Sequence, residues 1–140
     1  MKIVLAQSAG FCYGVRRAVE LAEETAKKGD PCVMLGSIIH NQDMIDHLAK
    51  QGMHCVDCVE EVPAGSFVIV RSHGESRAVH QALQDRGAVI LNATCPNVTH
   101  IHQIVSKAEQ QGRVPVIVGT PDHPEVKAIA GWCEHPVVLS

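Results

Sequence analysis

AQSAGFCYGVRRAVELA (residues 6–22) places Cys12 at a tight chain reversal, with Gly10 two residues before it and Gly14 two residues after it. The apolar run KIVLA (residues 2–6) precedes this reversal and predicts a strand. Apolar residues at helical spacing follow it and predict a helix over Val15–Lys28. The stretch therefore indicates the first βα unit of an α/β chain, with a thiol where the strand gives way to the helix.

Length and composition limit the class of protein. A chain of 140 residues with 46% hydrophobic and 19% charged residues is the size and composition of one globular domain. A net charge of −3 gives no indication of nucleic-acid binding. No apolar run approaches the ~20 residues that span a bilayer, and the first residues do not resemble a signal peptide. We expect a cytoplasmic protein, in which six cysteines favour metal binding or catalysis over disulfides.

The rest of the chain alternates short β-branched runs with amphipathic segments. This alternation predicts an α/β fold of small, mainly parallel sheets with flanking helices, built from pseudo-repeated βα units. The further predicted strands are Cys32–Leu35, Met53–Val56, Phe67–Arg71, Ala88–Leu91, Val114–Val118 and Val137–Leu139. The further predicted helices are Gln42–Gln51, Ser76–Arg86, Asn97–Gln111 and Pro124–Ala130.

Five chemically distinctive residues fall between the end of a predicted strand and the next helix. They are Cys12, His40, His73, Cys95 and His123. Ligands bind at this edge in open α/β sheets, because the carboxyl ends of parallel strands lie together there. We therefore expect these five side chains to converge on one site.

An internal repeat supports this convergence. A shift of 83 residues aligns six identical pairs over 29 ungapped positions, where average composition predicts about two. The pairs are Cys12 with Cys95, Val15 with Val98, Gly29 with Gly112, Val33 with Val116, Gly36 with Gly119, and His40 with His123. The chain holds one such repeat and about half of a second, and a third repeat would supply a third cysteine.

The two repeated thiols are candidate metal ligands. A helix N-terminus favours the thiolate form, and iron–sulfur centres are held by cysteine thiolates. Gly10 and Gly14 would allow the backbone beside Cys12 to approach a bulky group. The alternative is that Cys12 and Cys95 are buried cysteines that act as small hydrophobes.

Three of the histidines are candidate anion ligands. His40, His73 and His123 each stand near a predicted helix start, where backbone N–H groups attract anions, and together they suggest a diphosphate. The alternative is that each histidine caps its own turn. The histidines predicted to lie on polar, solvated helix faces are His47, His80, His100 and His102.

A carboxyl group and several polar side chains border the same edge. Glu125 lies two residues beyond His123 and is a candidate proton donor, although a carboxylate in a first helical turn commonly only complements the helix dipole. Arg71, Ser72 and Thr94 would assist anion binding or, equally well, form turns.

The remaining cysteines have simpler interpretations. Cys55 and Cys58 form a Cys-x-x-Cys pair, which can be half of a zinc site, but no partner pair with suitable spacing follows. A zinc protein using this pair and nearby histidines is a weaker alternative. Cys32 and Cys133 are predicted packing residues, with Cys133 a fallback ligand if the centre is built from this chain alone.

The motifs AGFCYGVRRAV, IIHN, RSHG, ATCPNV and HPEV occur in one order along the chain. In this order the chain resembles the 4-hydroxy-3-methylbut-2-enyl diphosphate reductases. The resemblance implies a trefoil of three similar α/β domains around a 4Fe-4S cluster with three cysteine ligands and one open iron. It implies an enzyme that removes the substrate's C4 hydroxyl reductively, giving isopentenyl and dimethylallyl diphosphate. A ferredoxin or flavodoxin would supply the electrons.

When the roles known in the family are assigned to the matching motifs, the resemblance implies that Cys12 and Cys95 are cluster ligands and that Glu125 is the proton donor. It makes His40, His73 and His123 the contacts to the diphosphate substrate.

The chain departs from the family's pattern at two points. Asn92 stands where the family usually has aspartate, and the chain is about half the usual length, without the third cluster ligand. It would therefore be an N-terminal portion whose site another segment or a second chain completes.

The resemblance also implies a division into domains. Residues 1–13 would form a strand that pairs with a missing third domain, residues 14–95 a first α/β domain, and residues 96–140 an incomplete second domain. The alternative to an enzyme is a non-catalytic metal- or anion-binding module that retains two of the three ligands.

Overall fold

A four-stranded parallel sheet forms the middle layer of the larger part of the protein. The structure is a computed structural model and describes residues 1–39 and 41–140. The strand order is β2-β1-β3-β4. The strands are β1 (Cys32–Leu35), β2 (His54–Val56), β3 (Phe67–Val70) and β4 (Val89–Asn92). This all-parallel sheet confirms the predicted fold class.

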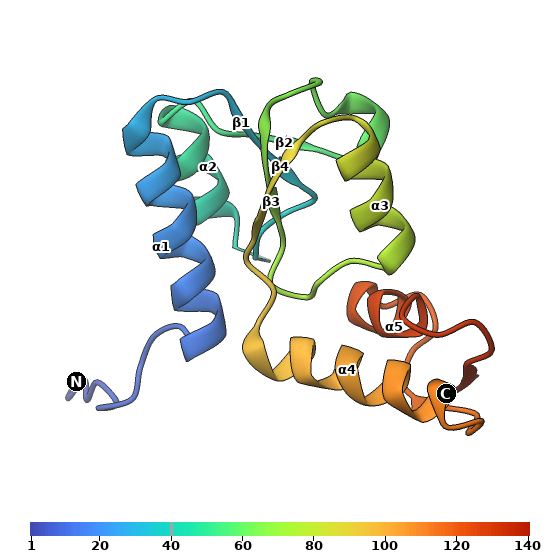
Figure 1. The fold of residues 1–140 in the computed structure, drawn as a ribbon. Coiled ribbons are helices and arrows are strands. Elements are labelled where there is room, and N and C mark those ends of the chain that lie inside the picture. Colours follow the sequence, from blue (N-terminus) through green and yellow to red (C-terminus); the bar gives the residue numbers. More distant parts are fainter. Residues whose placement is uncertain (40) are drawn as a thin grey trace.

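Helices cover both faces of this sheet (Figure 1). The helices on one face are α1 (Tyr13–Lys28) and α2 (Gln42–Lys50), and those on the other are α3 (Arg77–Asp85) and the 3-10 helix η1 (Val59–Glu61). Successive side chains of β3 point to opposite faces of the sheet, so this strand contributes to the hydrophobic core on each face. Ile69 packs under α1 and α2, while Val68 and Val70 pack under α3. All three side chains are fully buried.

The carboxyl-terminal third of the chain forms a second, smaller α/β unit. Its elements are α4 (Pro96–Gln110), β5 (Val116–Val118), α5 (Pro124–Ala130) and β6 (Val137–Leu139). β5 and β6 form a two-stranded parallel sheet, and a separate core gathers around Val105, Ile117 and Ile129. Figure 1 shows α4 and α5 beyond the carboxyl edge of the larger sheet. Within the part of the chain that the structure describes, no helix has the length and apolar character needed to cross a bilayer.

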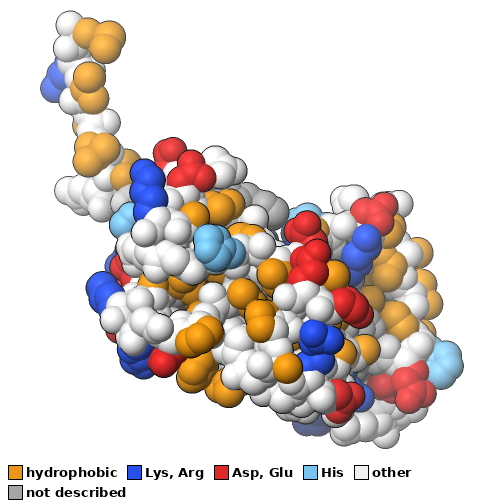
Figure 2. Space-filling model, turned by 90° about the horizontal axis from the view of Figure 1, so that it is seen from above, with side chains coloured by type: hydrophobic (Ala, Val, Ile, Leu, Met, Phe, Trp, Pro, Cys, Tyr) orange, Lys and Arg blue, Asp and Glu red, His pale blue; other side chains and the backbone are white. Residues whose placement is uncertain are grey.

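The helices and strands agree with the sequence predictions to within two residues at each end, apart from η1, which was not predicted, and one predicted strand. The predicted strand Lys2–Ala6 does not form in this chain, and these residues project from the body (Figures 1 and 2). Ile3, Val4 and Leu5 are 81%, 76% and 83% exposed. A strand requires a neighbour to take up its backbone hydrogen bonds, and no strand within the described residues lies beside this segment.

Candidate functional site

The site lies where the order of the larger sheet reverses. β2 lies to one side of β1 and β3 to the other, so the loops that follow β1 and β3 flank the reversal point at which such sheets bind ligands. These loops meet, because the Ser72 hydroxyl donates to the carbonyl oxygen of Ile38 at 3.1 Å. His73 lies in the second loop. His40, predicted for the first, lies outside the described residues.

The two candidate cluster ligands begin two helices that meet at this edge. Cys12 is the N-cap of α1 and Cys95 is the N-cap of α4, and neither thiol makes a capping hydrogen bond. The Cys95 sulfur lies against Gly14 in the first turn of α1, where a Cβ atom would come within 2.6 Å of it. The contact brings the starts of the two helices together, and the convergence of both thiols on one site stays a prediction.

Arg17 holds the Cys95 turn against α1. Its Nη1 donates to the carbonyl oxygen of Thr94 at 3.2 Å, and its Nη2 donates to that of Asn92 at 3.3 Å. The backbone N–H of Cys95 donates to the carbonyl oxygen of Ser72 at 2.9 Å. The Cys95 turn is thus bonded both to α1 and to the residue that precedes His73. Sequence reasoning missed Arg17, since nothing in the helical pattern distinguishes it from its neighbour.

Asn92 accepts the same hydrogen bonds that an aspartate at this position could accept. Its side-chain oxygen accepts hydrogen bonds from the Thr94 amide, at 3.0 Å, and from the Thr94 hydroxyl. Aspartate and asparagine share this acceptor. The departure at Asn92 therefore leaves the turn before Cys95 intact, and buried Thr94 serves this turn.

Two of the three predicted anion ligands lie together. The rings of His73 and His123 meet edge to face, with centroids 5.8 Å apart and planes at 87°. His123 is the N-cap of α5, and its Nδ1 accepts a hydrogen bond from the backbone N–H of Glu125 at 3.2 Å. A neutral ring that accepts at Nδ1 carries its hydrogen on Nε2, so His123 can donate from that atom to an anion.

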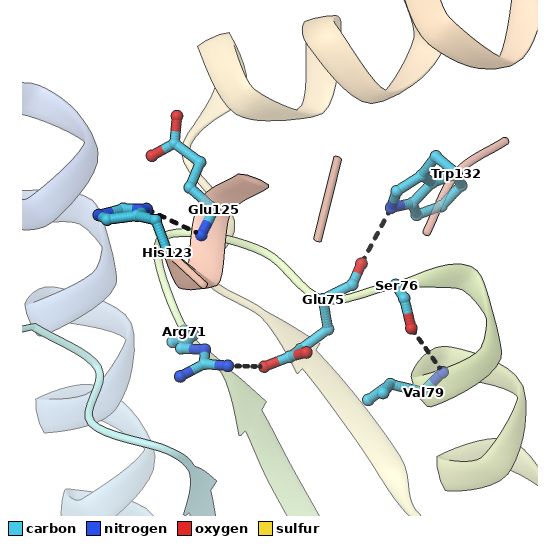
Figure 3. A network of polar contacts seen from close by, with 7 residues as sticks. All are labelled: Arg71, Glu75, Ser76, Val79, His123, Glu125 and Trp132. Atoms are coloured by element: carbon cyan, nitrogen blue, oxygen red, sulfur yellow. Dashed lines mark hydrogen bonds and ion pairs between the residues drawn. The ribbon is translucent and has the colours of Figure 1, made fainter. Parts of the chain in front are cut away.

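Glu125 shares the first turn of α5 with His123. In Figure 3 its carboxylate points away from the ion pair that Arg71 forms with Glu75. That ion pair has an N–O distance of 2.6 Å, so the Arg71 guanidinium already has an anionic partner. Arg71 and Glu125 are the two charged residues that the sequence placed at this edge. Among the ion pairs of the described residues, Arg71 has a charged partner and Glu125 has none.

The four other cysteines are less suited to ligate metal. Burial is the main cause that raises the pKa of Cys32, to about 11, and it also raises those of Cys55 and Cys133. A hydrogen bond with Glu60 is the main cause that raises the pKa of Cys58. A raised pKa disfavours the thiolate that binds metal. The half-buried Cys133 thiol donates instead to the carbonyl oxygen of Ala130, at 3.5 Å.

His102 is not a solvated surface residue, contrary to the sequence prediction. It is 4% exposed, and its ring stacks on that of Trp132 with centroids 5.0 Å apart. His80 packs against the same tryptophan, with centroids 5.9 Å apart. Both histidines lie where α3 and α4 meet. The cause is tertiary packing, because Trp132 arrives from a distant part of the chain.

The donor set fits part of an iron–sulfur centre. In residues 1–39 and 41–140, no three His, Cys, Asp or Glu side chains are grouped so as to hold a metal ion. This also gives the Cys55–Cys58 zinc alternative no support. Two uncapped thiols at adjoining helix starts suit two positions of a cluster that takes cysteine ligands.

Fold and site together define an α/β protein with a parallel sheet, in which two helix starts with cysteine N-caps adjoin and two imidazoles from loops and helix starts meet. The sequence pattern of the LytB protein family matches residues 3–140. The chain belongs to this family.

Similar proteins carry the name that the sequence motifs suggested. A 4-hydroxy-3-methylbut-2-enyl diphosphate reductase of Clostridium perfringens (strain 13) is 38% identical over 141 residues, covering 99% of this chain and 50% of that protein. One of Thermoanaerobacter sp. (strain X514) is 39% identical over 138 residues, covering 96% of this chain and 48% of that protein. The chain spans about half the length of these curated relatives, which agrees with the prediction of an N-terminal portion.

Two solved structures resemble this one. The first is (E)-4-hydroxy-3-methyl-but-2-enyl diphosphate reductase, described as the terminal enzyme of the non-mevalonate pathway. It matches with a TM-score of 0.85 and 38% identity over 98% of this chain and 50% of that chain. The second is the E-1-hydroxy-2-methyl-but-2-enyl-4-diphosphate reductase of Plasmodium falciparum, with a TM-score of 0.85 and 29% identity over 90% of this chain and 40% of that chain.

Proposed function

We propose that this chain forms the N-terminal portion of a 4-hydroxy-3-methylbut-2-enyl diphosphate reductase. In the proposed reaction the bond between C4 and its hydroxyl oxygen breaks, two electrons and two protons are taken up, and the oxygen leaves as water. The products are isopentenyl and dimethylallyl diphosphate. Family membership and the names of the similar proteins support this function. The observation that carries it is the contact between the Cys95 sulfur and the first turn of α1.

Cys12 and Cys95 would be two of the three cysteine ligands of a 4Fe-4S cluster. When bound, the cluster would supply electrons and a Lewis-acidic iron for the substrate hydroxyl. The third ligand would come from outside these 140 residues, either from further sequence or from a second chain.

The imidazoles would bind the diphosphate. His73 and His123 lie close enough to contact one group, and Nε2 of His123 is free of the hydrogen bond that occupies Nδ1. His40 would join them. Glu125 would deliver a proton to the substrate, since it follows His123 within the same helical turn.

The wider setting follows from the same proposal. Residues 14–95 would be one domain and residues 96–140 part of a second, which the separate cores support. Residues 1–13 would pair with a third domain, and their exposure supports this. A ferredoxin or flavodoxin would donate the electrons. Six unpaired cysteines favour the cytoplasm.

Anaerobic reconstitution with iron and sulfide tests the metal site. We expect Cys12→Ser and Cys95→Ser each to reduce the iron bound per chain, while Cys32→Ser, as a matched control, leaves it unchanged. Equal iron binding by all three variants would contradict the ligand assignment.

A non-catalytic module is the second candidate, because no three His, Cys, Asp or Glu side chains of the described residues are grouped so as to hold a metal ion. Joining the chain to the remaining half of a relative separates the two candidates. Reductase activity in that protein supports the enzyme, whereas a stable but inactive cluster supports the module.

A further inference from the structure

The only tryptophan of the chain, Trp132, follows α5 and packs where α4 meets α3. Its ring stacks on His102 with centroids 5.0 Å apart and planes at 15°. The guanidinium carbon of Arg77 lies 5.5 Å from the centroid of the tryptophan ring, and the His80 ring meets it at an angle of 61°. We call these four residues the Trp132 cluster. The cluster joins α3 of the larger unit to the smaller unit.

Hydrogen bonds tie the end of α5 to the start of α3. The indole N–H of Trp132 donates to the carbonyl oxygen of Glu75 at 2.9 Å (Figure 3). In the reverse direction, the backbone N–H of Arg77 donates to the carbonyl oxygen of Gly131 at 3.2 Å. The Nη2 atom of Arg77 donates to the carbonyl oxygen of Trp132 at 3.1 Å. A Cβ on Gly131 would lie 2.2 Å from the Cβ of Ser76. The two segments therefore fit against each other without room for another atom.

This junction is a bonded connection between the segments that carry the two imidazoles. Glu75 lies two residues after His73, so the indole hydrogen bond holds the loop that bears this histidine. Trp132 lies just beyond α5, and His123 caps the other end of that helix. Because a helix of seven residues moves as a rigid unit, the placement of its end also sets the placement of its start.

The other side of the cluster supports the same loop. His102 is 4% exposed, and a Cβ on Gly74 would lie 2.7 Å from its Cε1. The same Cβ would lie 3.1 Å from the Cγ2 atom of Thr94, the residue before Cys95. The stacked imidazole thus packs directly behind the residue that follows His73.

We propose that Trp132 is a positioning residue that fixes His123 relative to His73, so that both imidazoles contact one diphosphate. It acts through the carbonyl oxygen of Glu75 and through His102, and it does not itself contact the ligand. The part of this proposal that concerns diphosphate rests on the proposed function.

Trp132→Phe is the informative variant, because it retains an aromatic ring to stack on His102 while it removes the indole donor together with the second ring. Titration of the 140-residue chain with inorganic diphosphate is the first measurement. We expect Trp132→Phe to weaken binding about tenfold, as the loss of one well-placed hydrogen bond does. In a His123→Ala background the same change should have a smaller effect, since only His73 is then left to contact the ligand and its placement relative to His123 no longer matters.

A nuclear Overhauser contact between the ring protons of His73 and His123 is the second measurement, and it does not depend on diphosphate. We expect this contact in the wild type and its loss in Trp132→Phe. Gly112→Ala is the matched control, because it strains a left-handed residue with open space around it and so costs stability away from the cluster. It should keep both the contact and the affinity.

The outcomes separate the two proposals. If Trp132→Phe retains the ring contact, or if its loss of affinity simply adds to that of His123→Ala, Trp132 is not a positioning residue. If the wild type binds no diphosphate, the assignment of His73 and His123 as a diphosphate site in this chain fails, while the ring contact still decides the role of Trp132. Should Trp132→Phe not fold, Arg77→Lys removes the guanidinium bonds to the Ser106 hydroxyl and to the Trp132 carbonyl oxygen and is judged by the same measurements.

Discussion

Gly14 and Cys95 lie in direct contact, although 80 residues separate them in the chain. A Cβ on Gly14 would come within 2.6 Å of the Cys95 sulfur and 3.0 Å of its Cβ atom. Gly14 has ordinary helical geometry, so its small size and not its backbone conformation is what this position requires. The glycine allows the starts of α1 and α4 to adjoin.

We expect Gly14→Ala to displace the Cys95 thiol without unfolding the protein. The added methyl group forces the sulfur into another rotamer, whereas alanine is favoured over glycine in a helix by up to about 1 kcal/mol. The rate at which Cys95 reacts with a thiol reagent should change, and iron bound on reconstitution should fall. The melting temperature should fall only slightly, because the methyl group also crowds the Cys95 Cβ atom, which a rotamer change does not move, while the helix preference of alanine partly offsets the small shift required.

Gly29→Ala is the matched control for this variant, since it changes the glycine at the other end of the same helix. Gly29 has a φ of 74° with nothing near a Cβ, so the substitution costs stability but leaves the Cys95 thiol undisturbed. A wild-type thiol reactivity in Gly14→Ala would show that the contact does not constrain Cys95.

Arg17→Lys should loosen the turn that holds Cys95. Lysine keeps the charge but cannot reach both carbonyl oxygens at once, so we expect the free energy of unfolding to fall by about 1 kcal/mol. The amide of Cys95 should also exchange its hydrogen faster. Arg16→Lys is the control, because Arg16 is exposed. Equal effects of the two substitutions would contradict the role of Arg17.

The sequence predicted the elements well because their periodicities are local. Alternation in Phe67–Val70 and the helical spacing of Ala18, Val19 and Ala22 each place side chains into a core that the structure confirms. Lys2–Ala6 has the composition of a strand but has no strand beside it in the described part of the chain. Composition cannot supply a hydrogen-bonding neighbour.

The polar contacts behind the site were harder to predict, because they join distant segments. Arg17 bonds to residues more than 70 positions away, and no local pattern indicates this. For His102 a signal was present, since it lies four residues after Val98 and three before Val105, on the buried stripe of α4. The polarity of His102 suggested an exposed position, but its helical spacing from Val98 and Val105 places it on the buried face of α4.

Glu125→Gln tests the proposed proton donor in a protein whose site has been completed. We expect turnover to fall by roughly 10²–10⁴-fold, the usual range for removing a general acid, while cluster content stays unchanged. Asp122→Asn is the control, because Asp122 is an exposed acid near the same helix start that pairs with Lys127. Loss of the cluster in Glu125→Gln would contradict a role confined to proton delivery.

The buried position of His102 predicts how stability depends on pH. Burial, helped by nearby His80, lowers the pKa of His102 to about 4, whereas an unfolded chain has the ordinary value near 6.5. Between these values the unfolded state binds more protons than the folded state. Stability should therefore be complete above about pH 6.5 and should fall by up to about 3 kcal/mol as the pH drops to about 4.

Urea unfolding at pH 7.5 and pH 5 measures this dependence. His102→Gln should lower stability at both values, because Trp132 loses its stacked partner, but the difference between them should shrink. His100→Gln is the control, since His100 lies on the exposed face of the same helix and should keep the wild-type difference. If His102→Gln and His100→Gln lose the same amount of stability between pH 7.5 and pH 5, the acid sensitivity arises from another group. His102 would then be able to bind a proton in the folded protein.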